Sequence, residues 1–377
     1  MFLVIVYLAP SVKNQALILR LRSISLFQFK NYSGARFEFP GRIIGICGEN
    51  GVGKTNLVDA IYSLCFTKSY FNRSDSLNVQ HDRAGFRVEG DFERNGQQVK
   101  IVSVLRETGK KEFSADGRNY DRLAEHIGLL PAVIIAPDDV QIITGASEDR
   151  RRYLDTLFSQ MDPLYLQELI AYNKVLQQRN GYLKSIEDRR LANHALIDTY
   201  DQQLVTHGSL VHKMRAVFLE NLIPAVASFY QKIAGKAEDV RIIYESQLKQ
   251  TDYYSLLAQS RDKDLITQRT GVGVHKDDLV FQLSERVFRT QASQGQRKSL
   301  LFALKLAEFQ ALRLTKGFEP ILLLDDVFEK LDESRIANLL AWVCVENEGQ
   351  IFITDTHADR FRNHIDQLGI KYQLIRI

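Results

Sequence analysis

The sequence predicts an α/β fold in which a lobe with a mixed sheet, assembled from both ends of the chain, carries an inserted α-helical lobe. Three stretches support this prediction: a glycine-rich loop at Gly48–Thr55, an apolar strand followed by two acids at Ile321–Asp326, and a block of helical periodicity between them. A chain of 377 residues suffices for two domains or for one domain with a large insertion. We expect residues 19–145 and 266–377 to form the sheet lobe and residues 146–265 to form the helical lobe.

The composition is that of an ordinary globular protein, with 45% hydrophobic and 25% charged residues. The formal net charge of +3 permits nucleic-acid binding without requiring it, so any basic footprint has to be local. Cys47, Cys65 and Cys344 show no metal-ligand spacing, which favours a reducing, cytoplasmic setting over a disulfide framework. The apolar run at residues 2–9 is too short to span a membrane, and no membrane association is expected. We expect residues 1–18 to be an N-terminal extension, either an edge strand or, as we favour, the product of a misassigned start codon.

The glycine-rich loop matches G-x-x-x-x-G-K-[ST], the pattern of a P-loop. It consists of Gly48, Glu49, Asn50, Gly51, Val52, Gly53, Lys54 and Thr55. Its glycines permit positive φ, so successive backbone N–H groups can point at phosphate oxygens. Lys54 would bring a cation to the β- and γ-phosphates, and Thr55 would offer a hydroxyl group to Mg²⁺. An apolar stretch precedes the loop and a helical pattern follows it, so the sequence predicts a site for ATP and Mg²⁺ at a helix N-terminus.

Strand-like alternation dominates the chain on either side of the P-loop. Residues 19–39 give period-2 fragments around a predicted turn at Ser33-Gly34. Farther along, two alternating runs flank Asn95-Gly96, which is typical of a tight hairpin turn. A short apolar strand at residues 132–136 ends at Pro137. These segments predict the N-terminal part of the sheet lobe.

Helical periodicity begins at Ser147, which can cap a helix that we expect to end at Pro163. Leucines then repeat every seven residues within 169–183, and apolar residues repeat in the same way within 197–218. The two patterns predict an antiparallel helical hairpin joined near residues 188–193.

The C-terminal part combines strands with one long helix. A strand is expected within residues 271–283, a helix at 296–314 and a fully apolar strand at 321–324. Asp325 and Asp326 emerge at the carboxyl end of that last strand, where α/β proteins bind ligands. Asp325 would hold Mg²⁺, and Asp326 would orient or deprotonate the attacking water. A solvated acidic turn is the plainer alternative, but the accompanying P-loop argues against it.

The stretch that opens the long helix reads Ser293-Gln294-Gly295-Gln296-Arg297 and resembles the L-S-G-G-Q signature of ABC-type ATPases. It supplies a hydroxyl group, a glycine and a helix N-terminus, which suit a γ-phosphate. In ABC-type ATPases this segment meets the nucleotide of the other subunit. The resemblance therefore implies that Ser293, Gly295 and Gln296 contact ATP across a homodimer.

Two further ABC-type elements have candidate positions. Glu329–Asp332 stands where ABC-type ATPases carry the D-loop. Asp355, Thr356 and His357 follow a strand at 350–354, where those proteins carry the switch histidine. The sequence leaves open which of these three residues has that role.

Five stretches together resemble the RecF family of bacterial gap-repair ATPases, which are related to structural-maintenance-of-chromosomes heads. Their patterns are L-x-N-F-R-N-Y, the P-loop, P-E-D-L followed by G-S-P-x-x-R-R-x-F-L-D, G-P-H-R-D-D-L, and S-Q-G-Q followed by L-L-D-D-x-x-S-E-L-D. The corresponding segments are Leu26–Tyr32, Gly48–Thr55, Ala136–Asp155, Gly273–Leu279, and Ser293–Lys298 with Leu323–Asp332. The match runs from about Leu19 to the C-terminus.

The resemblance implies an ABC-type ATPase head with weak ATPase activity that dimerises on ATP. It also implies binding of double-stranded and gapped DNA, and joint action with RecR and RecO in loading RecA. The chain departs from the family patterns in that Gln28 replaces Asn, Lys30 and Lys276 replace Arg, Val274 replaces Pro, and Glu329-Lys330 replaces Ser-Glu. The last departure concerns the dimer contact, and none concerns the P-loop or the two acids.

Three other interpretations compete with this one. An ABC transporter ATPase subunit would need a membrane partner, and the long helical hairpin and the segment Gly273–Leu279 speak against it. A DNA tether, in which ATP closes a clamp and turnover is incidental, differs from the RecF interpretation only in its turnover. A P-loop kinase is a poor fit, because it would not explain the segment Ser293–Arg297 and because Asp325 and Asp326 come very late in the chain.

Basic residues of the helical lobe are candidate DNA contacts, because cations on helices that face a clamp interior neutralise phosphates without reading bases. The candidates are Arg150, Arg151, Lys174, Arg179 and Lys184. The alternatives are a solvated charged face or internal salt bridges, for instance between Arg151 and Asp155. If these residues do not contact DNA, the segment Lys68–Arg73 of the sheet lobe is the next candidate.

Overall fold

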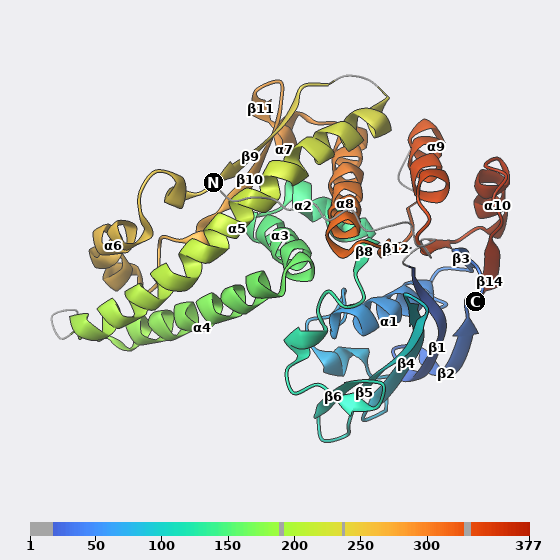
Figure 1. Cartoon of the computed structure of the whole chain (residues 1–377), viewed down its shortest axis with the longest axis horizontal. Coiled ribbons are helices and arrows are strands. Elements are labelled where there is room, and N and C mark those ends of the chain that lie inside the picture. Colours follow the sequence, from blue (N-terminus) through green and yellow to red (C-terminus); the bar gives the residue numbers. More distant parts are fainter. Residues whose placement is uncertain (1–17, 188–191, 236–237, 328–332) are drawn as a thin grey trace, which may run out of the picture.

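The computed structural model describes residues 18–187, 192–235, 238–327 and 333–377. Its strands form three sheets, with the orders β2-β1-β4-β5-β6-β7, β14-β3-β13-β12-β8 and β11-β10-β9. Figure 1 shows α1 and the two larger sheets on one side of the molecule and the long helices α4 and α5 on the other. Helices α3 and α8 lie between the two sides.

The six-stranded sheet is antiparallel and packs over α1 (Lys54–Phe66). Its strands are β1 (Leu19–Phe29), β2 (Tyr32–Glu38), β4 (Phe86–Arg94), β5 (Gln97–Leu105), β6 (Lys111–Ala115) and β7 (Arg118–Asn119). The predicted hairpin at Asn95-Gly96 is confirmed, with both residues at positive φ as a tight turn requires. The predicted turn at Ser33-Gly34 is wrong, because Gly34 pairs with Phe27 inside the sheet. The chain turns instead just after β1, where Lys30 has a φ of 52°.

The five-stranded sheet is parallel, as its pairings show. It consists of β3 (Ile43–Cys47), β8 (Ala132–Ile135), β12 (Ile321–Leu324), β13 (Ile351–Asp355) and β14 (Gln373–Arg376). Every residue of β3, β8, β12 and β13 is buried, which explains why these strands read as continuous apolar runs. Because the central strands are parallel, their carboxyl ends meet at one edge.

The helical side is built from α3 (Ser147–Met161), α4 (Pro163–Ser185), α5 (His194–Ala234) and α6 (Tyr253–Thr267). Pro163 does not end the first helix but begins the next, where its missing N–H group costs nothing. Leu183 and Ile197 share one buried cluster, as expected for an antiparallel hairpin. Most of the predicted connection near residues 188–193 lies outside the described residues.

The small antiparallel sheet contains β9 (Val240–Glu245), β10 (Asp278–Leu283) and β11 (Arg286–Val287). The strand expected from residue 271 begins only at Asp278, because residues 274–276 form a 3₁₀ turn. Gly273, with a φ of 123°, starts this turn, and a side chain there would collide with Tyr253. Strands β9 and β10 pair across the predicted domain boundary at residue 266.

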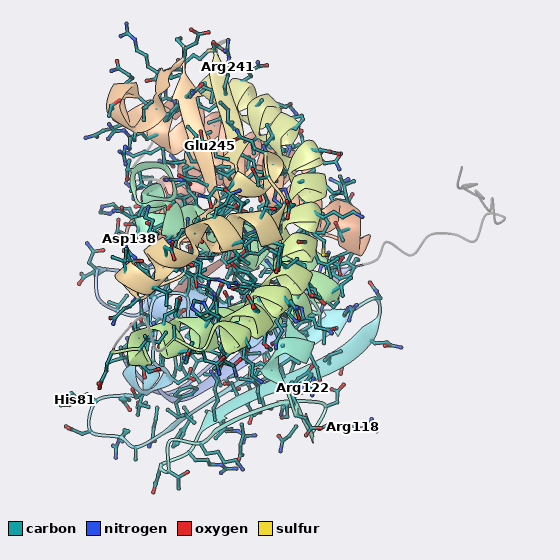
Figure 2. The ribbon with its side chains drawn as sticks, turned by 90° about the vertical axis from the view of Figure 1, so that its left-hand side faces the viewer. His81, Arg118, Arg122, Asp138, Arg241 and Glu245 are labelled. Carbon is teal, nitrogen blue, oxygen red and sulfur yellow. The ribbon has the colours of Figure 1, made fainter. Side chains whose placement is uncertain are left out.

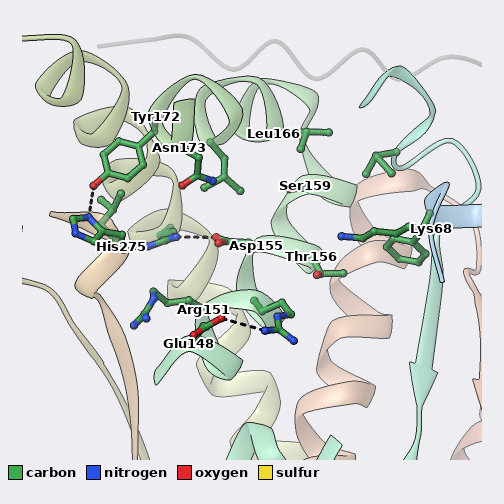
Figure 3. Close-up of a pocket in the computed structure, with 16 residues that line it drawn as sticks. Lys68, Glu148, Arg151, Asp155, Thr156, Ser159, Leu166, Tyr172, Asn173 and His275 are labelled. Carbon is green, nitrogen blue, oxygen red and sulfur yellow. Dashed lines mark hydrogen bonds and ion pairs between the residues drawn. The ribbon is translucent and has the colours of Figure 1, made fainter. Parts of the chain in front are cut away.

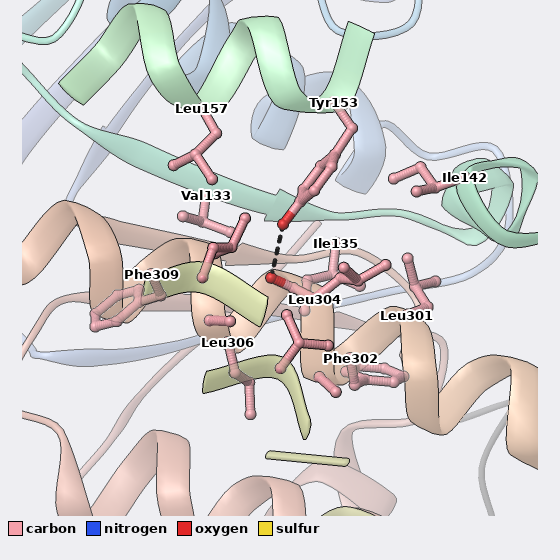
Figure 4. Close-up of a cluster of buried hydrophobic side chains, with 14 of the residues drawn as sticks. Val133, Ile135, Ile142, Tyr153, Leu157, Leu301, Phe302, Leu304, Leu306 and Phe309 are labelled. Carbon is pink, nitrogen blue, oxygen red and sulfur yellow. Dashed lines mark hydrogen bonds between the residues drawn. The ribbon is translucent and has the colours of Figure 1, made fainter. Parts of the chain in front are cut away.

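Helix α8 (Gln294–Lys316) runs through the middle of the molecule and joins its two sides. Figure 4 shows its apolar side chains packed against Val133 and Ile135 of β8 and against Tyr153 and Leu157 of α3. The Tyr153 hydroxyl group donates a 2.9 Å hydrogen bond to the carbonyl oxygen of Leu304 on α8. The remaining α-helices of the described residues are α2 (Gln141–Thr144), α7 (Phe288–Gln291), α9 (Glu333–Leu340) and α10 (Ala358–Asp366), and a π-helical turn at Ala341–Glu346 follows α9.

Charged side chains cover the outside of the molecule. Figure 2 shows Arg118 and Arg122 at the opposite end from Arg241, with the helices between them. Within the described ranges, no helix is both long enough and apolar enough to cross a bilayer.

Candidate functional site

The P-loop connects the buried strand β3 to α1. Gly51 and Gly53 have φ angles of 84° and 120°, which only glycine adopts without strain. A Cβ atom on Gly53 would lie 2.6 Å from the Asn31 side chain, so this position excludes larger residues. The loop thus curls back over the first turn of α1, as a phosphate cradle requires.

The turn between β1 and β2 holds the P-loop from outside. The Asn31 side-chain amide donates a 2.7 Å hydrogen bond to the carbonyl oxygen of Val52, and the Tyr32 hydroxyl group donates one of 3.1 Å to that of Gly53. Nothing in the spacing of the sequence indicated these contacts, although both residues lie in the first RecF-like stretch. Lys54 closes the loop, because its ammonium group donates to the carbonyl oxygens of Gly48 and Glu49, each at 2.7 Å. Phosphate oxygens would have to replace these acceptors.

Oxygen ligands suited to Mg²⁺ meet at the carboxyl edge of the parallel sheet. Thr55 Oγ1 lies 3.1 and 3.0 Å from the two carboxylate oxygens of Asp325, at the end of β12. Thr354 on β13 donates a 2.8 Å hydrogen bond to Asp325 Oδ1 and thereby orients this carboxylate. Burial raises the pKa of Asp325 despite hydrogen bonds from both threonines, and a bound cation would favour its ionised form. A hydroxyl group beside a carboxylate fits Mg²⁺ with phosphate and water as further ligands.

Asp326 follows in an unusual backbone conformation, with a φ of 51°. Its N–H group donates a 2.8 Å hydrogen bond to Thr354 Oγ1, which holds the strand end in this left-handed geometry. Aspartate tolerates this region better than most residues, and such conformations cluster at functional sites. Thr354 therefore positions both acids, a role that sequence reasoning missed.

The three switch candidates differ in what their side chains do. Asp355 is buried, and its carboxylate accepts hydrogen bonds from Arg360, the shortest of 2.6 Å, and one of 2.9 Å from the N–H group of His357. Thr356 also donates to Asp355, at 3.4 Å. The exposed His357 imidazole has no hydrogen-bond partner among the described residues. His357 is therefore the candidate best able to reach a nucleotide.

The signature-like residues form the N-terminus of α8. Ser293 Oγ accepts a hydrogen bond from the N–H group of Gln296, and the Gln296 side chain accepts one from the N–H group of Ser293. This capping box leaves the first turn of the helix well ordered. A Cβ atom on Gly295 would lie 2.1 Å from the Arg335 guanidinium group of α9, so a side chain there would displace this arginine. The candidate D-loop, Glu329–Asp332, lies outside the described residues.

The five predicted DNA contacts have unequal surroundings. Arg179 is fully buried and donates to Asp201 at 2.7 Å and to Asp264 at 2.8 Å. Its assignment as a DNA contact is therefore wrong, because this guanidinium group neutralises internal acids. Lys174 and Lys184 are exposed on α4.

The remaining two predicted contacts lie at the start of α3. Arg150 is largely buried in a two-pronged ion pair with Asp278, at 2.6 and 2.9 Å, and so has a structural role. Within the part of the chain that the structure describes, the Arg151 guanidinium group donates only to the carbonyl oxygen of Asp277, at 2.8 Å. Asp155, the alternative partner for Arg151, instead pairs with Arg215.

Comparison with known proteins identifies the family. A family model described as the RecF/RecN/SMC N terminal domain matches residues 20–374. The chain is 41% identical over 359 residues to the DNA replication and repair protein RecF of Flavobacterium johnsoniae, covering 95% of this chain and all of that protein. It is 40% identical over 340 residues to the RecF of Cytophaga hutchinsonii, covering 90% of both chains. The chain belongs to the RecF family.

Solved structures agree with this membership. A RecF structure described as the recombination mediator protein RecF with ATP in the RecFOR pathway superimposes with a TM-score of 0.84 and 30% identity, covering 92% of this chain and 94% of that one. An Smc head domain from Pyrococcus furiosus shares only the fold, with a TM-score of 0.53 and 15% identity over 92% of both chains. The predicted fold class, an ABC-type P-loop ATPase head with an inserted helical lobe, is thus confirmed for this member of the RecF family.

Proposed function

We propose that this protein is an ATP-dependent DNA-binding protein of recombinational gap repair and replication-fork maintenance. It binds duplex and gapped DNA, dimerises on ATP, hydrolyses ATP weakly and promotes RecA loading together with RecO and RecR. The relatives named RecF, and the solved RecF described with ATP, support this proposal. The observation that carries it is the approach of Thr55 to Asp325, at 3.0 Å, beside a P-loop.

Each residue of the site has a separate role in binding or hydrolysing ATP. The P-loop N–H groups and Lys54 hold the phosphates, Thr55 and Asp325 hold Mg²⁺, and Asp326 orients or deprotonates the attacking water. Mg²⁺, when bound, neutralises phosphate charge. Thr354 supports these roles because its hydroxyl group holds Asp325 and Asp326 in place.

The separation of the two halves of the site supports an ATP-dependent homodimer. Figure 1 shows α7, which directly precedes α8, far from α1 and β3. The N-terminus of α8, with Ser293, Gly295 and Gln296, is therefore remote from the P-loop of the same chain. These residues can contact ATP only when a second copy supplies the nucleotide, and ATP then joins the two copies.

For DNA, the exposed Lys174 and Lys184 of α4 remain the proposed phosphate contacts of the helical lobe, together with Arg151. Each would neutralise a phosphate without sequence preference. Sedimentation of the full chain with ATP, with ADP or with neither, each with and without duplex DNA, tests the proposal. We expect dimers with ATP and co-sedimentation with DNA in that state. A monomer in all six conditions would contradict it.

A further inference from the structure

A pocket of about 460 Å³ lies between the two lobes and is separate from the P-loop. One wall comes from the end of α1 and the residues after it, including Phe66 and Lys68. The other walls come from α3, α4 and the turn at Val274 and His275. Figure 3 shows Lys68 pointing across the pocket toward Thr156 and Ser159 on α3. An occupant would therefore touch both lobes at once.

Positive charge exceeds negative charge in the lining. Four basic side chains face two carboxylates, namely Lys68, Arg151, Arg152 and Arg215 against Glu148 and Asp155. The carboxylates are already engaged, because Asp155 accepts hydrogen bonds from Arg215 at 2.8 Å and from Tyr165 at 2.5 Å, and Glu148 pairs with Arg152 at 3.3 Å. His275 adds no charge at neutral pH, since burial lowers its pKa to about 4.

Two cations of the pocket lack an acidic partner. Among the residues that the structure describes, no carboxylate forms an ion pair with Lys68 or Arg151. Burial and the neighbouring Arg152 both lower the pKa of Lys68. Burial and Arg215 lower the pKa of Arg151, although Asp278 opposes this effect. Cations that are partly desolvated and lie beside other cations favour an anionic ligand.

The lining also has an apolar part, from Phe66, Ile127, Leu166, Leu169 and Val274, beside polar side chains such as Thr156, Ser159 and Asn173. The volume is in the range of sites for small ligands, about 300–1,000 Å³. A double helix keeps its bases paired and stacked inside, so it offers such a pocket only phosphate. An unpaired nucleotide offers both a phosphate and the face of a base, and single-strand sites combine cations with surfaces for bases in this way.

We infer that the pocket between Lys68 and Arg151 binds an unpaired nucleotide of a DNA strand, with its phosphates on these two cations and its base against the apolar wall. This inference rests on the proposed DNA binding and extends it by assigning a site to the single strand of a gap. Lys68 lies two residues beyond the end of α1, and the P-loop leads into the first turn of the same helix. A strand in the pocket and ATP at the P-loop would thus act on opposite ends of one helix.

The test uses the full chain with saturating ATP and two DNA probes: a blunt duplex, and the same duplex with a single-stranded tail. Wild type should bind the tailed probe more tightly. Lys68→Gln combined with Arg151→Gln should reduce that preference about tenfold, because both proposed contacts to single-strand phosphate are lost. The slope of log K against log salt for the tailed probe should flatten by about 1.4, at about 0.7 per lost single-strand phosphate contact. Binding of the blunt duplex should lose at most the one phosphate contact proposed for Arg151, a flattening of about 0.9, and Lys68→Gln alone should leave it unchanged.

Lys110→Gln combined with Lys263→Gln is the matched control, because it removes the same charge from exposed positions outside the pocket. Lys68→Gln alone is a second test in case the double variant misfolds. Lys68 makes no hydrogen bond to a described residue, so its replacement should leave the fold intact. The slope for the tailed probe should then flatten by about 0.7. Equal binding of both probes by wild type, or equal losses for both probes in the variants, would overturn this inference and leave the proposed function intact. Failure of wild type to bind either probe would overturn both.

Discussion

Lys305 and Glu308 form a buried ion pair on α8, with Lys305 Nζ 3.6 Å from Glu308 Oε2 and both side chains at most 5% exposed. Lys305 Nζ also lies 3.8 Å from Asp139, which follows β8, and Asp139 accepts a hydrogen bond from Tyr70, which follows α1. One lysine thus joins α8 to the sheet lobe while two acids compete for it. Burial raises the pKa of Glu308 to about 7, because Lys305 offsets only part of the cost of desolvation and Asp139 adds to it.

This pKa predicts how stability depends on pH. Unfolded Glu308 ionises near pH 4.3, so between about pH 4.3 and 7 the folded state binds more protons and the free energy of unfolding falls as pH rises. The contribution of Glu308 to this fall is at most about 4 kcal/mol, because each pH unit between the unfolded and folded pKa values corresponds to about 1.36 kcal/mol. Glu308→Gln should flatten the slope in urea unfolding from pH 4.5 to 7.5. The exposed Glu220→Gln should leave it unchanged, and identical slopes for wild type and Glu308→Gln would contradict the prediction.

ATP binding should depend on Lys54. Its ammonium group already lies over the P-loop, 2.7 Å from two carbonyl oxygens, and it supplies the positive charge for the β- and γ-phosphates. Lys54→Ala should abolish nucleotide binding in equilibrium dialysis with labelled ATP, with unchanged thermal unfolding of the free protein. Wild-type affinity in this variant would remove the P-loop assignment.

Turnover should depend on Asp326. Asp326→Asn keeps the size of the side chain and, because asparagine also tolerates positive φ, the backbone geometry. It should bind ATP, accumulate as a dimer and stall hydrolysis, since the carboxylate base is lost. Phosphate release and sedimentation of the same sample measure both effects. Hydrolysis at the wild-type rate would show that another group acts as the base.

Dimerisation should depend on the N-terminus of α8. Ser293→Arg places a large side chain where the γ-phosphate of a second copy would lie, and it should prevent the ATP-dependent dimer while each monomer still binds ATP. The lost cap costs about 1 kcal/mol of stability, which thermal unfolding can separate from the assembly defect. Thr199→Arg, on an exposed position of α5, is the matched control. A dimer that persists in Ser293→Arg would rule out the signature role.

Surface and buried cations of α4 should behave differently. Lys174→Gln with Lys184→Gln should flatten the salt dependence of duplex binding by about 1.8, at about 0.9 per phosphate contact, without loss of stability. Arg179→Gln should leave that slope unchanged but lower the free energy of unfolding by about 3–5 kcal/mol, because two buried acids lose their partner. Superimposable slopes for wild type and the lysine variant would place the DNA path elsewhere.

Contiguous residues were enough to predict most of the candidate nucleotide site. The P-loop, the apolar strand before Asp325 and the capped start of α8 at Ser293 each lie within a few neighbouring positions. Their chemistry depends on local spacing, because a loop that cradles phosphate and a strand that ends in an acid are each built from a single segment. The same locality explains why the hairpin at Asn95-Gly96 and the positions of the long helices were predicted.

Only the tertiary structure decided which polar and charged side chains, distant in sequence, pair with one another. Arg179 resembles a surface cation in the sequence. In the structure it is buried and pairs with two acids, 22 and 85 residues away in the chain. Thr354 resembles any strand residue until the parallel sheet brings it against Asp325, 29 residues earlier in the chain. The turn after β1 places the Lys30 ammonium group 2.5 Å from the buried Asp59. Each outcome depends on the desolvation of a polar group and on the partner that the fold brings to it, and neither can be derived from local spacing.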